Sequence, residues 1–310
     1  MEQVDSVVVI GGGIMGCDVA AIFLTNGCDV QIVEPSAAAR NTLQKRCMQA
    51  CHALGHDEPQ GRLDALARPS DIVWSDVSIV IECAPEKLEV KQRVFAELES
   101  LAPAHVPLTS NSSSLPISSI GAGLKTRPRM LGLHFFMPAH LVPAVEVVRS
   151  DVSDEAVALK VSDIMRRVGK KPVQVKKDVP GFLANRIQHA LMREAISLVE
   201  QGFASAEDVD VAVRYGFGFR YIAAGALLQK DLAGIDIHYA AAATMYPYLN
   251  ADTTPSPLMQ QLVERGDTGV KSPAKRGFYD WDDASIAKAR ARYETALLKA
   301  TQILRDEEIS

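Results

Sequence analysis

The feature that most constrains the fold is a glycine-rich segment directly after a short apolar run. Val7–Ile10 is typical of a buried strand, and it is followed by Gly11-Gly12-Gly13-Ile14-Met15-Gly16 at the start of a stretch with helical spacing. The segment fits the G-x-G-x-x-G pattern of a dinucleotide-binding βαβ unit. A glycine-rich turn can also serve packing alone, but the strand before it and the helix after it favour a nucleotide site.

Each part of this segment has an expected role. Gly11 allows a tight turn, Gly13 lets the backbone approach a pyrophosphate, and Gly16 lets the helix pack close to the sheet. The pyrophosphate would lie at the helix N-terminus, formed by Ile14 and Met15, because N–H groups are exposed there and carry partial positive charge.

An acidic residue stands where such a site needs one. A second apolar run, Val30–Val33, ends at Glu34, 18 residues after Gly16. A carboxylate there can accept hydrogen bonds from the adenosine ribose hydroxyls and would repel a 2′-phosphate, which predicts NAD rather than NADP. A solvated residue at a strand end is the alternative for Glu34. A flavin is the rival ligand, but the sequence holds no second dinucleotide motif.

The first half of the chain alternates β-branched runs with helical stretches, which predicts an α/β domain with a Rossmann-like, mostly parallel sheet. The expected strands are Val7–Ile10, Val30–Val33, Ser78–Glu82, Val106–Ser110, Met130–Phe136, Ala144–Val148 and Pro172–Lys176. The expected helices are Met15–Asn26, Ser36–Leu54, Leu88–Leu101 and Asp154–Val168, the last with Ser153 as its N-cap.

After Lys176 the apolar residues recur only at helical spacing. The expected helices there are Phe182–Gln201, Ala206–Tyr215, Ala223–Leu232, Ile235–Leu249, Pro257–Glu264 and Ser285–Leu304. We therefore predict two domains: residues 1–177, which bind NAD, and an all-helical C-terminal domain over residues 178–310.

Composition excludes several classes of protein. With 33 basic and 38 acidic side chains the net charge is −5, which argues against a nucleic-acid binder. No apolar run reaches the length of a membrane span or has the features of a signal peptide. Hydrophobic residues make up 47% of the chain, enough for a sizeable core. We expect a soluble, cytoplasmic protein.

The five cysteines support this expectation. They are odd in number and scattered over the first 83 residues, unlike a secreted disulfide scaffold. Cys47, Cys51 and His52 could form half of a metal site, but no second pair follows to complete a tetrahedron, so we predict no metal.

Two strands near the middle of the chain carry groups suited to proton transfer. His134 ends the run Leu131–His134, and Glu146 lies among valines, where a carboxylate is costly to bury without a partner. If these strands are neighbours, Glu146 can accept a hydrogen bond from one imidazole nitrogen and leave the other as a general base near neutral pH. A lone histidine is more often a hydrogen-bonded core residue, but the acid and the nucleotide site favour catalysis.

A polar segment, Ser110–Ser114, follows a predicted strand. In open α/β sheets ligands bind at the carboxyl ends of the strands, so these hydroxyls and the Asn111 amide could orient a nicotinamide ribose or a substrate oxygen. An N-cap for a helix near Pro116 is the alternative.

These pieces together resemble the L-3-hydroxyacyl-CoA dehydrogenase family. The matching segments are Val9–Gly16, Glu82–Glu86 with Lys91, Ser110–Leu115, His134–Phe136 with Glu146, and Val179–Arg186, with weaker matches at Lys271-Ser272 and Gly277–Tyr279. They run in the family's order over nearly the whole chain. The resemblance implies a Rossmann-like domain, a helical dimerising domain, a homodimer, and a role such as fatty acid metabolism.

The resemblance also implies roles for single residues. His134 would be the general base or acid, held by Glu146, while Ser113 and Asn185 would bind the substrate oxygen. The residues expected around the nicotinamide half of NAD are Ala84, Glu86, Lys91, Asn111 and, from the second domain, Lys271. The predicted reaction moves a hydride between NAD and a 3-hydroxyacyl-CoA or a related 3-hydroxy acid.

Three departures leave the substrate open. Met137 stands where acyl-CoA enzymes have asparagine, the usual Gly-Pro-Phe segment is replaced by residues 216–225, and the stretch from Glu34 to Glu86 is compact. These features resemble branches that act on small CoA-free acids, such as carnitine, gulonate and pyridine-carboxylate dehydrogenases. Arg186 and Arg220 are candidates to bind a substrate carboxylate. A non-catalytic NAD-binding protein of the same fold is the remaining alternative.

Overall fold

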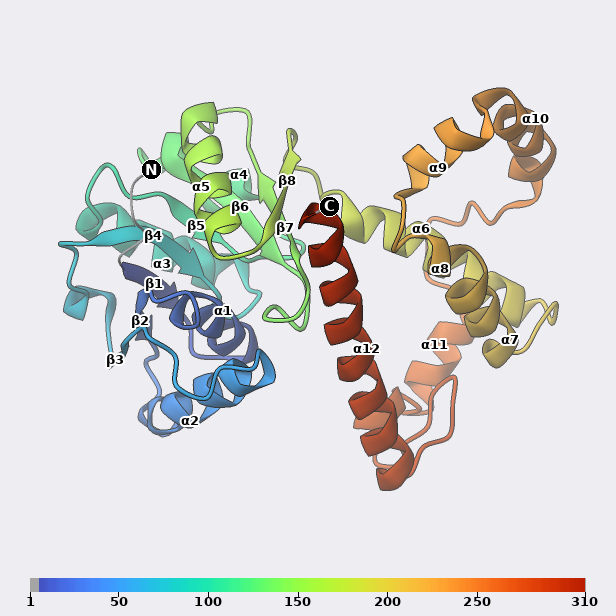
Figure 1. Ribbon diagram of the computed structural model, residues 1–310, viewed down its shortest axis with the longest axis horizontal. Helices are drawn as coiled ribbons and strands as arrows, with labels where there is room; N and C mark the ends of the chain where they lie inside the picture. The colour runs from blue at the N-terminus through green and yellow to red at the C-terminus, as the bar shows by residue number, and fades with distance from the viewer. Residues whose placement is uncertain (1–5, 310) are drawn as a thin grey trace. The chain divides into compact units, whose positions relative to one another are not determined.

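The computed structural model describes residues 6–309, and its chain divides into two compact units (Figure 1). The first unit ends at Ala184 and the second begins at Asn185. The chain crosses from one to the other at the start of α6 (Ala184–Glu200). Each unit is described by itself below.

The first unit is built on an 8-stranded sheet with the order β3-β2-β1-β4-β5-β6-β7-β8. Neighbouring strands are parallel except for β6 and β7, which are antiparallel. The strands are β1 (Ser6–Ile10), β2 (Asp29–Val33), β3 (Leu63–Leu66), β4 (Val77–Glu82), β5 (Leu108–Ser110), β6 (Met130–Phe135), β7 (Ala144–Val148) and β8 (Lys171–Val175). The order β3-β2-β1-β4-β5-β6 is that of a dinucleotide-binding sheet, which confirms the predicted Rossmann-like fold.

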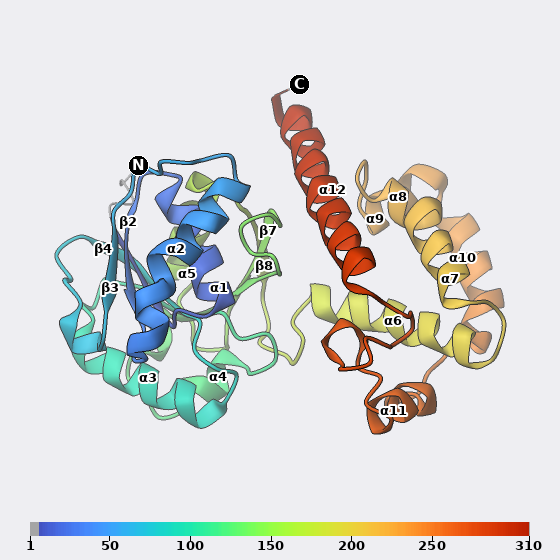
Figure 2. The same ribbon diagram turned by 90° about the horizontal axis from the view of Figure 1, so that it is seen from below.

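Helices cover both faces of this sheet (Figure 2). One layer holds α1 (Ile14–Leu24), α2 (Ala37–Ala53) and α5 (Glu155–Arg167), and its core includes Val7 and Val9 of β1. The other holds α3 (Leu88–Leu101) and α4 (Ile117–Ile120), and its core includes Val8 and Ile10. Successive side chains of β1 therefore pack into the cores on opposite faces of the sheet, as expected of a strand that is buried on both faces.

The structure corrects three details of the predicted elements. β3 was not predicted: Leu-Asp-Ala-Leu lacks a β-branched run because this edge strand is only partly buried. β5 begins at Leu108 rather than Val106. The N-cap of α5 is Asp154 instead of Ser153: the Asp154 carboxylate accepts from the Ala156 amide at 2.8 Å, while the Ser153 hydroxyl donates to the Met130 carbonyl at 2.7 Å.

The second unit is helical over its described residues, apart from one isolated bridge between Arg276 and Asp280. After α6 its helices are α7 (Ala206–Val211), a π-helical turn (Ala212–Phe217), α8 (Gly218–Arg220), α9 (Ala226–Ala233), α10 (Ile235–Met245), α11 (Pro257–Glu264) and α12 (Asp283–Ile309). None of the helices within residues 6–309 is long and apolar enough to cross a membrane.

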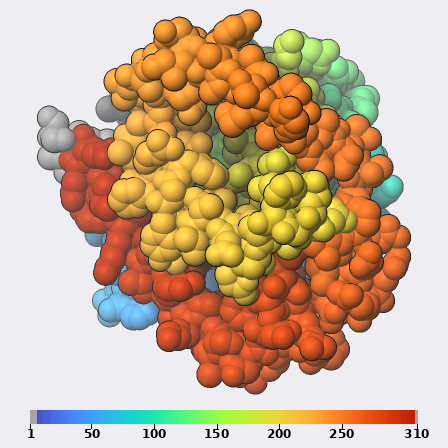
Figure 3. All heavy atoms as spheres, turned by 90° about the vertical axis from the view of Figure 1, so that its right-hand side faces the viewer, coloured from blue at the N-terminus to red at the C-terminus, as the bar shows by residue number. Residues whose placement is uncertain are grey.

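The second unit has almost no core of its own. Among its described residues Ile196 is the only apolar side chain counted as buried, at 7% exposure. Many large apolar side chains of α9, α10 and the turn after them face solvent; Leu227, Leu232, Tyr239 and Tyr248 are 77–87% exposed. Part of this surface lies on the face shown in yellow and orange in Figure 3. Apolar exposure of this extent is typical of interaction surfaces.

Candidate active site

The glycine loop between β1 and α1 has the conformation that its sequence requires. Gly11 has a φ of +106°, and a Cβ there would lie 2.8 Å from the Cys83 carbonyl oxygen. A Cβ on Gly16 would lie 1.9 Å from the Gly11 oxygen, so only glycine lets α1 start this close to β1. Gly13 is exposed and has open space around its Cα. The loop thus leaves its backbone accessible beside the N-terminus of an 11-residue helix, which fits a dinucleotide pyrophosphate.

Glu34, at the end of β2, is tied to this loop. One carboxylate oxygen accepts from the Gly12 amide at 3.0 Å and the other from the Ser36 amide at 2.9 Å. On the other side of the loop, Arg46 of α2 donates to the Gly12 carbonyl at 2.6 Å. Glu34 therefore lies beside the glycine loop, where its carboxylate is partly exposed.

His134 and Glu146 form a buried pair. The antiparallel register of β6 and β7 makes them direct cross-strand partners. His134 Nδ1 lies 2.8 Å from Glu146 Oε2, and the two residues are 3% and 1% exposed. The other ring nitrogen, Nε2, lies 3.1 Å from the Ser113 hydroxyl. The structure thus brings together three of the four residues predicted to act on the substrate.

The second oxygen of Glu146 is also satisfied. Oε1 accepts from the amides of Leu183 and Ala184 at 3.0 and 2.8 Å. Burial raises the pKa of Glu146, but the hydrogen bonds from His134 and from these two amides outweigh it and lower the pKa below its usual value. Glu146 is therefore an anion at neutral pH, and it favours the tautomer in which Nδ1 carries the proton.

Two aromatic rings flank the imidazole. The Phe136 ring lies edge-on at 4.7 Å between centroids, and the Phe182 ring lies tilted at 5.5 Å. His134 itself is buried. The catalytic candidate therefore has an apolar setting with polar partners only at its two nitrogens.

Glu86 holds the serine segment that follows β5. Its Oε1 accepts from the hydroxyls of Ser112 and Ser114 at 2.6 and 2.9 Å, and from the amides of Ser113 and Ser114 at 3.2 and 3.1 Å. The Ser112 hydroxyl in turn accepts from the Leu115 amide at 2.8 Å. These serines order a turn instead of capping α4, whose N-cap is Pro116 and has no side-chain cap bond. Glu86 thus positions the Ser113 hydroxyl that bonds to His134.

Asn111, also in this segment, links two neighbouring strands. Its side-chain oxygen accepts from the Phe135 amide at 2.8 Å, directly after His134. Its predicted role is a contact with NAD, and the position at the carboxyl end of β5 agrees with the edge where ligands bind in such sheets.

Lys91 lies under the serine segment in a buried ion pair with Glu82. Lys91 Nζ is 2.8 and 3.0 Å from the two Glu82 oxygens and 3.3 Å from Glu86 Oε2, while Lys91 is 1% and Glu82 0% exposed. Glu82 also accepts from the Ser110 hydroxyl at 2.6 Å and from the Ala84 amide at 2.7 Å. Sequence reasoning missed Glu82, although an acid at the end of Ile79-Val80-Ile81 is the same signal that identified Glu146.

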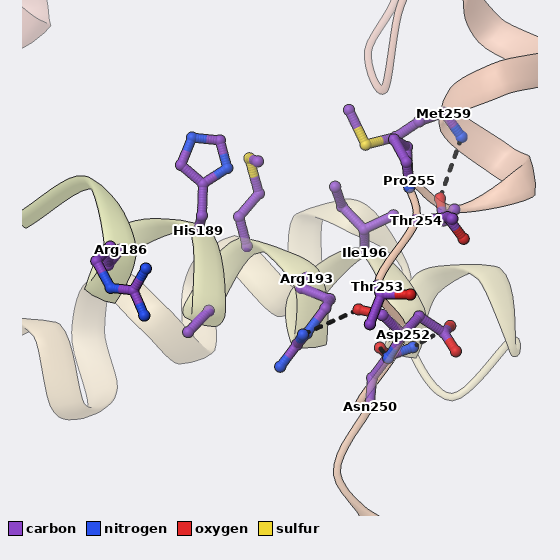
Figure 4. A pocket seen from close by; sticks show the side chains of 13 residues that line it. Arg186, His189, Arg193, Ile196, Asn250, Asp252, Thr253, Thr254, Pro255 and Met259 are labelled. Atoms are coloured by element: carbon purple, nitrogen blue, oxygen red, sulfur yellow. Dashed lines mark hydrogen bonds between the residues drawn. The ribbon is translucent and has the colours of Figure 1, made fainter. Parts of the chain in front are cut away.

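The remaining predicted residues belong to the second unit. Asn185 follows Ala184 directly in α6, and Lys271 and Arg220 are exposed at the ends of short helical turns. Arg186 lines a cavity of about 590 Å³ formed by α6, residues 250–256 and Met259 of α11 (Figure 4). Arg193 donates to the Asp252 carbonyl at 2.9 Å within this cavity.

Comparison with known proteins matches both parts of the chain to models of one protein family. Residues 6–179 match the family model for the 3-hydroxyacyl-CoA dehydrogenase NAD binding domain, and residues 181–281 match the one for the C-terminal domain. A 3-hydroxybutyryl-CoA dehydrogenase of Mycobacterium tuberculosis (strain CDC 1551 / Oshkosh) is 35% identical over 90% of this chain and 99% of its own.

A relative named for a different substrate matches a larger share of the chain at a lower identity. The 5-formyl-3-hydroxy-2-methylpyridine 4-carboxylate 5-dehydrogenase of Mesorhizobium japonicum (strain LMG 29417 / CECT 9101 / MAFF 303099) is 29% identical over 99% of this chain and 100% of its own. A crystal structure of a dehydrogenase of that substrate, described as NAD+-dependent, has a TM-score of 0.90 at 28% identity and covers 98% of this chain and 99% of its own.

These matches confirm the predicted family, an NAD-dependent oxidoreductase acting on CH–OH groups, and they confirm NAD as its cofactor. Together with the glycine loop and the order of the sheet, they show that the chain belongs to the 3-hydroxyacyl-CoA dehydrogenase family.

Proposed function

We propose that this protein oxidises a secondary hydroxyl group β to a carboxyl or thioester carbon, with His134 as the general base. The observation that carries the proposal is the buried His134–Glu146 pair, in which the second ring nitrogen, Nε2, lies 3.1 Å from the Ser113 hydroxyl. The pair lies in the same unit as the glycine loop.

The chain's own groups support a short proton-transfer step. Glu146 keeps the proton on Nδ1, so that Nε2 presents its lone pair and takes the proton of the substrate hydroxyl. The Ser113 hydroxyl lies beside Nε2, and with the Asn185 amide it would bind the substrate oxygen as charge develops there. Bound NAD supplies the electron sink, since it accepts the hydride that leaves the same carbon.

The glycine loop would hold the NAD pyrophosphate, and Glu34 the adenosine ribose, with Ala84, Glu86, Lys91 and Asn111 near the nicotinamide. Glu34→Ala should weaken NAD binding about tenfold, as expected when hydrogen bonds to a charged group are lost, and reduce the preference for NAD over NADP. Fluorescence titration with both cofactors measures this, with Glu58→Ala as an exposed acidic control. Unchanged affinity and unchanged preference in Glu34→Ala would remove Glu34 from the site.

A CoA-free aromatic carboxylate is the second candidate substrate. Met137 is 63% exposed close after His134, where it offers an apolar surface, and the imidazole already lies between two rings. Arg186, in the cavity of the second unit, supplies a guanidinium suited to a carboxylate. The TM-score of 0.90 to a pyridine-carboxylate dehydrogenase supports this candidate.

Absorbance of NADH at steady state separates the candidates. The assay uses acetoacetyl-CoA, free acetoacetate, and an aromatic aldehyde or alcohol that carries a ring carboxylate. Turnover of acetoacetyl-CoA or of free acetoacetate supports the first proposal and tells whether the substrate carries CoA, and turnover of the aromatic compound alone supports the second candidate. Tight NADH binding with no turnover of any of them would favour a non-catalytic NAD-binding protein.

We further propose that the protein is a homodimer through its helical domain, which we take as residues 178–310. A unit with Ile196 as its one buried apolar side chain in the described region needs a partner to cover it, and the family resemblance implies a second copy. Sedimentation should give a dimer mass for the wild type and a monomer mass for Leu227→Lys with Leu232→Lys. Leu159→Lys, at an apolar residue of α5 that is 52% exposed, is the matched control. A wild-type monomer would contradict the proposal.

The cysteines are odd in number and scattered, and four of the five are buried, which is unlike a secreted disulfide scaffold and supports the cytoplasm as the location.

A further inference from the structure

We propose that the turn at Gly181–Phe182 and the amides of Leu183 and Ala184, where α6 begins, act as a clamp that positions Glu146, and through it the imidazole of His134. We call the N–H groups of Leu183 and Ala184 the amide clamp. The inference rests on the proposed function, because it assigns a positioning role toward the same His134–Glu146 pair.

The first argument is that the two oxygens of Glu146 bind different partners. Oε2 bonds to His134 Nδ1 at 2.8 Å, and Oε1 bonds to both amides of the clamp at 3.0 and 2.8 Å. A carboxylate that is 1% exposed and held at both ends cannot rotate away from the imidazole without breaking hydrogen bonds that water does not replace. The clamp therefore fixes the direction in which the anion faces His134.

The second argument is the backbone that presents the amides. Gly181 has a φ of +77° and Phe182 a φ of +48°, a region that a bulky residue rarely adopts. Such a conformation persists only where surrounding contacts fix it. The Phe182 amide donates to the Val179 carbonyl at 3.0 Å, and the Phe182 ring, 3% exposed, packs beside His134. One residue thus turns the chain toward Glu146 and covers a side of the imidazole.

The third argument is electrostatic. The clamp lies at the N-terminus of the 17-residue helix α6, where unpaired N–H groups and the helix dipole favour an anion. Within the described residues, His134 is the titratable side chain bonded to Glu146, and no other charged side chain is bonded to it. The electrostatic environment of the Glu146 carboxylate is therefore determined by His134 and the two amides.

Ala184 permits a direct test, because it is the first residue of α6 and proline is accepted at that position. Ala184→Pro removes one N–H of the clamp, and Ala184→Gly keeps it as the matched control. With one donor lost, the Glu146 carboxylate becomes more basic and stabilises the imidazolium more strongly. The Nδ1–H signal of His134 in the NMR spectrum, which reports its hydrogen bond to Glu146, should shift in Ala184→Pro and stay at the wild-type position in Ala184→Gly.

Activity gives a second readout. The acid limb of kcat/KM should move to higher pH in Ala184→Pro, and kcat should fall about tenfold, the effect of one lost hydrogen bond to a charged group. A folded Ala184→Pro variant whose His134 Nδ1–H signal matches that of Ala184→Gly, with the same pH profile, overturns the proposal. So does a reduced kcat with an unmoved profile, because it would show a purely structural effect.

A third measurement does not require the proline variant to fold. Amide hydrogen exchange of Leu183 and Ala184 should be slow in the wild type and at least tenfold faster in Glu146→Leu, which lacks both acceptor oxygens. Equal exchange rates in the two proteins overturn the clamp. Both NMR readouts are independent of turnover, so a clamp confirmed in an enzyme that turns over no substrate would leave the clamp in place and remove the proposed function.

Discussion

Replacing His134 with alanine should lower kcat by about 10³-fold, because a positioned general base contributes roughly 10²–10⁴-fold to such reactions. NADH affinity should change little, since the imidazole bonds to Glu146 and Ser113 and to no residue of the glycine loop. The two quantities are measured by steady-state turnover with the preferred substrate and by fluorescence titration with NADH.

His105→Ala, at an exposed histidine of the same unit, serves as the control for loss of an imidazole. If His134→Ala loses NADH affinity by as large a factor as it loses turnover, its assignment as the base is wrong. Ser113→Ala should reduce kcat less than His134→Ala does, because it removes a hydrogen bond to Nε2 and leaves the base in place.

The largest effect on stability is expected at Lys91. Lys91→Met should lower the free energy of unfolding by roughly 3–5 kcal/mol, because it leaves the Glu82 carboxylate buried without its cation. The ion pair has no exposed side: Lys91 is 1% and Glu82 0% exposed, at 2.8 Å. Urea unfolding followed by circular dichroism measures the change.

Lys87→Met provides the matched control, since Lys87 is exposed at the N-cap of the same helix and makes no side-chain cap bond. It should change the unfolding free energy by less than about 0.5 kcal/mol. The double variant Lys91→Met with Glu82→Gln should recover part of the loss, because the buried charge is removed. Equal stabilities of Lys91→Met and Lys87→Met would contradict the importance of the pair.

The sheet could be predicted from the sequence because its strands are buried on both faces and therefore read as β-branched runs, as in Val7–Ile10 and Val30–Val33. β3 lies at the edge, where partial burial removes that signal. The helices of the second unit followed from periodicity. Their packing did not, because the pattern shows that Leu227 and Leu232 are apolar without showing whether they are buried.

The site, too, could be predicted in part from the sequence. An acid among valines indicated that Glu146 needs a partner, and a register of two strands was enough to make that partner His134. The amides that hold its other oxygen could not be predicted, since nearly every residue has an N–H and the positive φ values of Gly181 and Phe182 are visible only in the structure. Glu82 follows the apolar run Ile79-Val80-Ile81, and this pattern also indicates a buried acid that needs a partner.

A continuous series of polar contacts now runs from Lys91 through Glu86 and the serine turn to His134, and on through Glu146 to the start of α6. Each member contacts the next, so a replacement at one of them removes a contact of its neighbours. Met137 and Arg186 take no part in these contacts. A change of substrate should therefore come from replacements at such side chains. These can vary one at a time while the residues that transfer the proton stay the same.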